Sequence, residues 1–149
     1  VVLPVPADHQ ISTLELVKDS LAGKILSDVT VPLVPPKVGT VQMPPEGSAG
    51  KRAQDFLGEE VRVISAFQNI AAHLLQQDVT IECDVLVTGN DKESRQRVID
   101  MIGEAGMTGW HAGPIANAAA AESLTSILIQ INRSGGISHS GIKIIGQEH

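Results

Sequence analysis

Short apolar runs alternate along the chain with longer stretches in which apolar residues recur every three or four positions. The runs predict buried strands, and the longer stretches predict helices with one apolar face. The expected strands cover residues 1–5, 24–29, 61–66 and 84–88, with a short edge strand at 108–112 and a strand or extended segment at 141–145. The expected helices cover residues 9–21, 48–58, 90–106 and 115–133, with a short helix inside residues 67–77.

Local signals indicate where several of these helices begin. Asp8 is expected to cap the first helix, and Ser48 begins the second. Asn90 followed by Glu93 has the spacing of a capping box, which predicts the start of the next long helix. The helix over residues 115–133 is apolar on nearly all sides, so we expect it to lie in a core or in an interface.

Strands separated by helices of this length predict a mostly parallel sheet. We therefore expect an α/β fold in which an incomplete Rossmann-like sheet carries flanking helices and a long buried C-terminal helix, with residues 1–149 as a single domain. Ligands in such folds bind at the carboxyl ends of the strands. Residues 4–6, 31–33 and 66–68 follow those ends, and their small or apolar character suits a flat uncharged ring better than a phosphate.

Two features bear on the cleft itself. Residues 30–47 contain five prolines and predict a long surface loop, which is either a lid over the cleft or a plain connection. Neither G-x-G-x-x-G nor G-x-x-x-x-G-K-[ST] occurs in the sequence, so the usual glycine-rich turns that bind a phosphate are missing from it.

Composition narrows the class of protein. Aromatic residues make up 2% of the chain, so the core is expected to be aliphatic. The net charge is −6 and basic residues form no run, which argues against binding to nucleic acid. Cys83 is the single cysteine, and no apolar run is long enough to span a bilayer. We expect a cytoplasmic protein that binds no membrane, and the single cysteine is compatible with a reducing compartment. We also expect no metal site, because the histidines lack the spacing of metal ligands.

Five polar residues in apolar surroundings are each open to two interpretations. Gln68 and Asn69 follow a strand, where they either bind the edge of a cofactor or form a polar turn. Ser123 and Thr125 lie on the apolar helix, where a hydroxyl either faces a ligand or bonds to the carbonyl four residues earlier. Glu122 is the only acid of that helix, and a structural partner or contact with water is favoured over catalysis.

Several blocks of the sequence resemble one protein family, and they occur in the family's order. They are VPLVP at residues 31–35, SAFQNIAA at 65–72, DVLVTGND at 84–91, AGPIAN at 112–117, ESLT at 122–125 and GIK at 141–143. Together they resemble the NADPH-dependent reductases of the deazaflavin coenzyme F420, also called F420H2:NADP oxidoreductases. A similar order of segments occurs in the oxidoreductase domain of membrane-bound metalloreductases, so the resemblance is more specific for the fold than for the cofactor.

The resemblance implies that the chain corresponds to the C-terminal two-thirds of such a reductase and lacks its N-terminal glycine-rich NADP-binding part. In that family, hydride passes directly between NADP(H) and F420, so no residue is expected to act as a catalytic acid or base. The protein stacks the two rings, excludes water and orients their faces. The expected assembly is a homodimer through the apolar C-terminal helix.

Eight residues are implied as cofactor contacts. Six correspond to the wall that binds the deazaflavin ring: Gln68, Asn69, Ile70, Ser123, Thr125 and Ser140. Pro4 and Pro6 correspond to positions that flank the nicotinamide. The chain departs from its relatives at Gln68, where they can have histidine, and at Ala119, where they can have arginine. Both departures remove a positive or titratable side chain near an acidic cofactor. A flavin-like or quinone-like molecule is therefore an alternative to F420 as the acceptor.

Two other functions remain open. The first is a binding or assembly module without catalysis, in which the apolar helix packs against a second copy. The second is a reductase of the same fold that uses another flavin or a metal chelate as acceptor. A glycine-rich turn encoded upstream of Val1 would favour a reductase over an assembly module.

Overall fold

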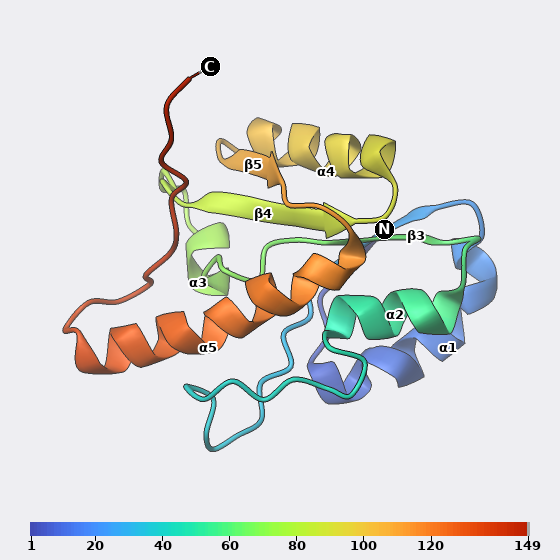
Figure 1. The fold of residues 1–149 in the computed structure, drawn as a ribbon, viewed down its shortest axis with the longest axis horizontal. Helices are drawn as coiled ribbons and strands as arrows, with labels where there is room; N and C mark the ends of the chain where they lie inside the picture. The colour runs from blue at the N-terminus through green and yellow to red at the C-terminus, as the bar shows by residue number, and fades with distance from the viewer. Residues whose placement is uncertain (149) are drawn as a thin grey trace.

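A five-stranded sheet runs through residues 1–148, the part of the chain that the computed structural model describes (Figure 1). Its strands lie side by side in chain order: β1 (Val2–Leu3), β2 (Ile25–Asp28), β3 (Arg62–Ser65), β4 (Asp84–Gly89) and β5 (Thr108–His111). The first three strands are parallel, and β4 is parallel to β5. β4 is antiparallel to β3. The prediction of an α/β fold with a mostly parallel sheet is therefore confirmed.

The connections between strands account for these directions. The helices α1 (Gln10–Leu21), α2 (Ala49–Leu57) and α4 (Lys92–Glu104) each lie in a crossover that returns the chain to the opposite edge, as a parallel neighbour requires. Between β3 and β4 the chain forms only the short helix α3 (Ala72–Leu75). Because no long helix crosses back, β4 starts at the edge of the sheet where β3 ends. Residues 66–83 therefore begin and end at the carboxyl edge of β3.

Helices cover both faces of the sheet. In Figure 1, α4 lies on one side, and α1, α2 and α5 (Ala118–Ser134) lie on the other. The short 3₁₀ turns η1 (Ala7–His9) and η2 (Ile115–Asn117) precede α1 and α5. Among residues 1–148, no helix is both long enough and apolar enough to cross a membrane.

Each face of the sheet has its own aliphatic core, as the low aromatic content predicts. Val63 and the neighbouring Ile64 of β3 are both fully buried, but they belong to different cores. Successive residues of a strand point to opposite faces, so a short strand such as β3 contributes to both. The first core also contains Ala118 at the start of α5, which anchors that helix to the sheet.

Two of the predicted helix caps are wrong. Asp8 caps nothing, because η1 leads directly into α1 and no side chain caps that helix. The N-cap residue of α4 is Asp91 rather than Asn90, since the Asp91 carboxylate accepts from the backbone N–H of Ser94 at 2.7 Å. The Asn90 side chain instead accepts from the first backbone N–H of η2 at 3.1 Å, which ties the end of β4 to that turn. The predicted start of α2 at Ser48 is correct.

The long C-terminal helix is buried along one face only. Its buried residues include Ala118, Glu122 and Leu128, whereas Ile127 and Ile131 are 47% and 40% exposed. The apolar residues that predicted a helix buried all round are thus divided between a core face and an open face. Residues 141–145 form no regular strand, although the Ile142 carbonyl accepts from the N–H of Asp84 at 2.8 Å and so lies beside the start of β4.

The proline-rich segment, residues 30–47, forms a loop without helix or strand, as predicted. Gln42 Nε2 donates to the carbonyls of Val34 and Lys37, both at 3.2 Å, so the loop is bonded to itself. Gly39 lies against α5, where a side chain would meet Gln130 Oε1 at 2.8 Å. The loop therefore rests on the same helix that carries Thr125.

Candidate functional site

The carboxyl ends of β1, β2 and β3 share one edge of the sheet, which is where this fold binds ligands. Phe67 lies just after β3 with φ at 70°, a left-handed conformation that few residues other than glycine adopt. Beyond this turn, Gln68 Nε2 donates to the Asp28 carbonyl at 3.0 Å and to Ser65 Oγ at 2.8 Å. The Gln68 side chain thus connects the carboxyl ends of β2 and β3.

A small cavity of about 110 Å³ lies between this turn and the C-terminal half of α5. Five of the predicted cofactor contacts line it together: Gln68, Asn69, Ile70, Thr125 and Ser140. Thr125 Oγ1 donates to the Gln68 carbonyl at 2.7 Å and to Asn69 Oδ1 at 3.3 Å, so α5 is bonded directly to the turn. Residues that are far apart in the sequence are therefore neighbours here. Their role in cofactor binding stays a prediction.

The segment after α5 supplies the third side of this cavity. The Ser140 N–H donates to Asn132 Oδ1 at 3.1 Å, and the Ser140 hydroxyl donates to the Leu128 carbonyl at 3.2 Å. Because both acceptors belong to α5, the chain folds back onto that helix. The described residues that line the cavity include no Asp, Glu, Lys or Arg. The cavity therefore offers amides, hydroxyls and an imidazole to a ligand, without a formal charge from those four residue types.

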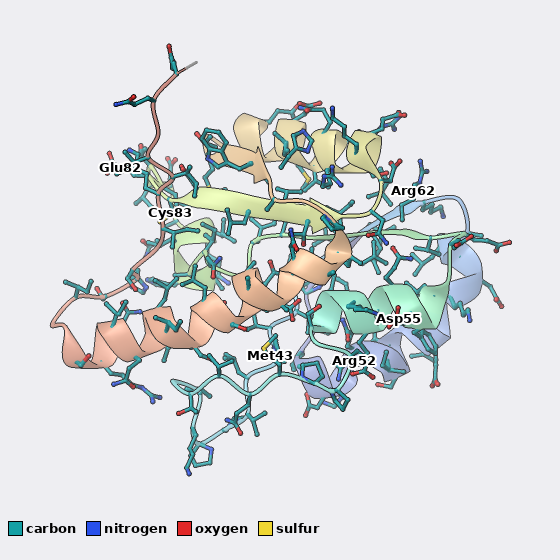
Figure 2. The ribbon with its side chains drawn as sticks, viewed as in Figure 1. Met43, Arg52, Asp55, Arg62, Glu82 and Cys83 are labelled. Atoms are coloured by element: carbon teal, nitrogen blue, oxygen red, sulfur yellow. The ribbon has the colours of Figure 1, made fainter. Side chains whose placement is uncertain are left out.

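The other three predicted contacts lie elsewhere. The Ser123 hydroxyl donates to the Ala119 carbonyl at 2.5 Å, which is the bond within the helix that such residues often make. Pro6 lines a second cavity of about 690 Å³, together with Met43 of the proline-rich loop and Arg52 of α2. Figure 2 labels Met43 and Arg52. Pro4 is exposed after the end of β1. The predicted roles of these three residues also stay predictions.

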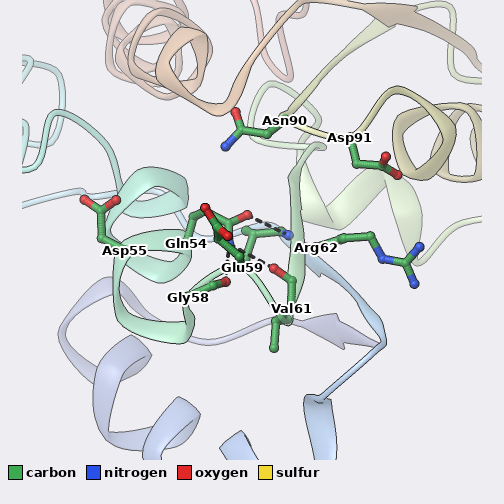
Figure 3. Close-up of a pocket in the computed structure, with 9 residues that line it drawn as sticks. Gln54, Asp55, Gly58, Glu59, Val61, Arg62, Asn90 and Asp91 are labelled. Atoms are coloured by element: carbon green, nitrogen blue, oxygen red, sulfur yellow. Dashed lines mark hydrogen bonds between the residues drawn. The ribbon is translucent and has the colours of Figure 1, made fainter.

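A further cavity, of about 500 Å³, lies around the amino end of β3 and the carboxyl end of β4, at the opposite edge of the sheet (Figure 3). Gln54 Nε2 donates to the Val61 carbonyl at 2.9 Å and Gln54 Oε1 accepts from the Val63 N–H at 3.1 Å, so this amide serves the fold. Three carboxylates also line the cavity: Asp55, Glu59 and Asp91. Arg62 lines the cavity as well, so the acids outnumber the basic residue among the described lining residues. This balance disfavours an acidic cofactor, and none of the predicted contacts lies there.

A buried carboxylate joins α5 to α2. Glu122 is 1% exposed, and its two oxygens accept from the N–H groups of Ala49 at 2.6 Å and Gly50 at 3.1 Å. These donors belong to the first turn of α2, where backbone N–H groups have no partner within the helix. Burial raises the pKa of Glu122 to about 7, against the lowering effect of the two donors. The start of α2 is thus the structural partner that Glu122 was expected to need.

Sequence reasoning missed a second buried carboxylate, Asp28 at the end of β2. Its side chain accepts from Gln10 Nε2 at 2.7 Å and from the Thr30 N–H at 3.0 Å. Gln10 Oε1 in turn accepts from Arg52 Nε at 2.8 Å. Burial raises the pKa of Asp28 by more than these bonds lower it. The one available signal was an acid inside the apolar run of an expected strand. Among residues 1–148, His, Cys, Asp and Glu form no group of three that would hold a metal ion.

The raised pKa of Glu122 predicts that the folded chain becomes less stable as the pH rises. An unfolded chain loses this proton near pH 4.5 and the folded chain near pH 7, so the native state binds the extra proton between those values. Raising the pH through this window should therefore lower the free energy of unfolding by about 3 kcal/mol. Asp28 adds to the decrease, because its pKa is also raised.

Urea unfolding across this pH range measures the effect, and Glu122→Gln should remove most of it because glutamine does not titrate. The exposed Glu15→Gln serves as the control and should leave the pH dependence as it is in the wild type. Equal pH dependence in Glu122→Gln and wild type would contradict the assignment to Glu122.

The sheet, its flanking helices and the polar groups at its carboxyl edge define a Rossmann-like α/β chain. A crystal structure from Arthrobacter sp. FB24 that is assigned to the F420-dependent NADP reductases matches it with a TM-score of 0.83 and 26% identity, over 98% of this chain and 68% of that one. The hypothetical protein SMa0349 of Sinorhizobium meliloti shares the fold, with a TM-score of 0.66 over 80% of this chain and 58% of its own, at 19% identity.

Sequence comparison identifies the family. The F420-dependent NADP reductase of Methanocaldococcus jannaschii is 33% identical over 153 residues, which cover 99% of this chain and 68% of that protein. The enzyme of the same name from Methanothermobacter thermautotrophicus is 33% identical over 150 residues, with 97% and 65% covered. The chain therefore belongs to the F420-dependent NADP reductase family, and it spans about two-thirds of the length of these relatives. No protein-family profile matches it.

Proposed function

We propose that the chain forms the deazaflavin side of the cleft in a reductase that moves hydride between NADP(H) and coenzyme F420. The observation that carries the proposal is the cavity shared by Gln68, Asn69, Ile70, Thr125 and Ser140. Family resemblance alone grouped these residues, and they come from three separate segments of the chain. The similarity to the F420-dependent NADP reductases of Methanocaldococcus jannaschii and Methanothermobacter thermautotrophicus also supports this proposal.

The cavity suits one edge of a flat ring rather than a whole cofactor. Its volume of about 110 Å³ is below the roughly 300 Å³ at which ligand pockets begin. Gln68 Oε1 is an acceptor and Asn69 Nδ2 a donor, and neither has a partner among the described residues. They match the pyrimidine-like edge of a deazaflavin, which alternates donors and acceptors. Because hydride passes directly between two carbon atoms, these residues position the ring and exclude water, and none acts as a base.

Titration of the chain with F420 and with NADPH tests this assignment. F420 is expected to bind, with a change in its fluorescence. NADPH should not saturate the chain below about 1 mM, because the chain has neither glycine-rich phosphate-binding motif. Micromolar affinity for NADPH, or no interaction with F420, would refute the proposal.

The uncharged cavity lining favours a second candidate, a reductase that uses a neutral flavin as its acceptor. The lining residues include no Lys or Arg that would attract the acidic tail of F420. Titration with riboflavin in the same experiment distinguishes the two candidates. Riboflavin binding without F420 binding would establish the neutral flavin as the ligand.

We also propose that two copies of the chain associate through the open face of α5. Ile127 and Ile131 lie one helical turn apart and expose 47% and 40% of their surface, which is unfavourable in water. Ile131→Glu is expected to convert a dimer to a monomer in sedimentation at about 100 µM. Leu16→Glu, on the exposed face of α1, should leave the dimer intact. A wild-type chain that is monomeric at this concentration would contradict the proposal.

A further inference from the structure

One aromatic contact at the small cavity is not explained by the packing of the fold. His139, in the segment after α5, lines the cavity, and its ring stacks on that of His73 in α3. The ring centroids are 5.3 Å apart and the planes are inclined by 25°. His73 is not among the described residues that line the cavity, and both histidines are exposed, so a ligand has access to the face of the His139 ring that His73 does not cover. The pair bridges α3 and the C-terminal segment at the cavity rim.

Contacts of the neighbouring residues fix the backbone at His139, while the residue itself is exposed. Its φ of 55° lies in the left-handed region, which is uncommon for residues other than glycine. The next residue, Ser140, is bonded twice to α5, and Gly141 packs so closely against Cys83 that it has no room for a side chain. A backbone conformation of this kind persists only where neighbouring contacts impose it, and such positions cluster at ligand sites.

His139 differs from the other polar residues of the cavity because its ring can stack on the ring of a ligand. The amides and hydroxyls of Gln68, Asn69 and Thr125 offer hydrogen bonds in the plane of an entering ring edge. His139 brings the one aromatic ring among the described residues that line the cavity. Flat aromatic rings attract one another when they stack with an offset.

We propose that His139 determines specificity for a flat heteroaromatic ring by forming the wall on which that ring stacks as its edge enters the cavity. His73 is a positioning residue, which fixes the His139 ring from its outer face. This inference rests on the proposed function, because the ring in question is the deazaflavin of F420. It extends that function to two residues that neither the sequence patterns nor the family resemblance indicated.

Four variants of the chain test the proposal by titration with F420 and, separately, with riboflavin. His139→Asn keeps a residue that tolerates the left-handed backbone but removes the ring, and should weaken F420 binding about tenfold. His73→Ala removes the support and should weaken it about threefold, whereas His73→Phe keeps a stacking ring and should stay within about twofold of the wild type. Ser138→Ala changes an exposed neighbour and serves as the control. Thermal unfolding of each variant is measured in parallel, since a purely structural role would lower its midpoint without the rescue by His73→Phe.

The outcomes separate this inference from the proposed function. If the wild type binds F420 and His139→Asn binds it equally well, the stacking role of His139 is refuted and the proposed function stands. If the wild type binds only riboflavin and the same ranking of variants appears, the F420 assignment fails and the wall stands. If neither ring binds, or if Ser138→Ala is as weak as His139→Asn, the proposal is overturned.

Discussion

Replacing Glu122 with alanine is expected to lower the free energy of unfolding by about 3 kcal/mol. The Glu122 carboxylate accepts from the N–H groups of Ala49 and Gly50 at 2.6 and 3.1 Å, and the residue is 1% exposed. Its loss leaves two buried donors at the start of α2 without a partner and opens a space between α2 and α5. Urea unfolding followed by circular dichroism measures the change at a fixed pH below 7, where ionisation of Glu122 does not yet destabilise the folded wild type.

Two further variants place this effect on the carboxylate itself. Glu15→Ala, on an exposed position of α1, should change the free energy of unfolding by less than about 0.5 kcal/mol. Glu122→Gln should fall between this control and Glu122→Ala, because the amide oxygen accepts one of the two bonds while its NH₂ group faces the other donor. A loss below about 1 kcal/mol for Glu122→Ala would show that the helix start does not need this partner.

The second large effect is expected for Thr125→Leu, which should weaken F420 binding about 100-fold. The larger side chain enters a cavity of only about 110 Å³, and the change removes the hydroxyl that donates to the Gln68 carbonyl at 2.7 Å. The leucine side chain then fills the space that the ring edge would occupy, and the turn at Gln68 loses the hydrogen bond that holds it to α5. Fluorescence titration with F420 measures the affinity.

A matched pair of substitutions separates volume from hydrogen bonding. Thr125→Val keeps the shape and removes only the hydroxyl, so F420 affinity should fall about tenfold. Thr108→Leu, at an exposed position of β5, should have no effect. In a version of the chain extended by a glycine-rich NADP-binding part, Thr125→Leu should leave NADPH affinity unchanged. An equal loss of F420 and NADPH binding would refute the placement of the ring beside Thr125.

The order of strands and helices was predictable because each element carries its own pattern. The apolar run over residues 61–66, for example, coincides with β3, whose Val63 and Ile64 are buried on opposite faces. The direction of β4 was not predictable in this way, because an apolar run shows that a strand is buried and not which way it runs. The short helix α3 accounts for the reversal, and its length was the one relevant signal.

The caps and the polar contacts show where local reasoning ends. Asn90 and Asp91 are both good capping residues, so the sequence pattern alone cannot choose between them. Asp28, Gln10 and Arg52 meet through bonds that join residues 18 and 42 positions apart, and no spacing rule connects them. Family resemblance grouped Gln68 with Thr125 as cofactor contacts, and no local pattern could have done so, because the residues of this cavity come from segments that only the folded chain brings together. Their role in binding stays a prediction.

Nuclear magnetic resonance of the isotope-labelled chain during a titration with F420 locates the ring most directly. The backbone N–H signals of residues 68–70, Thr125 and Ser140 are expected to shift most, because these residues line the cavity into which the ring edge would enter. The signals of Asn90 and Asp91 at the opposite edge of the sheet should stay in place. Shifts centred on that opposite edge, or none on addition of F420, would contradict a deazaflavin site at the carboxyl end of β3.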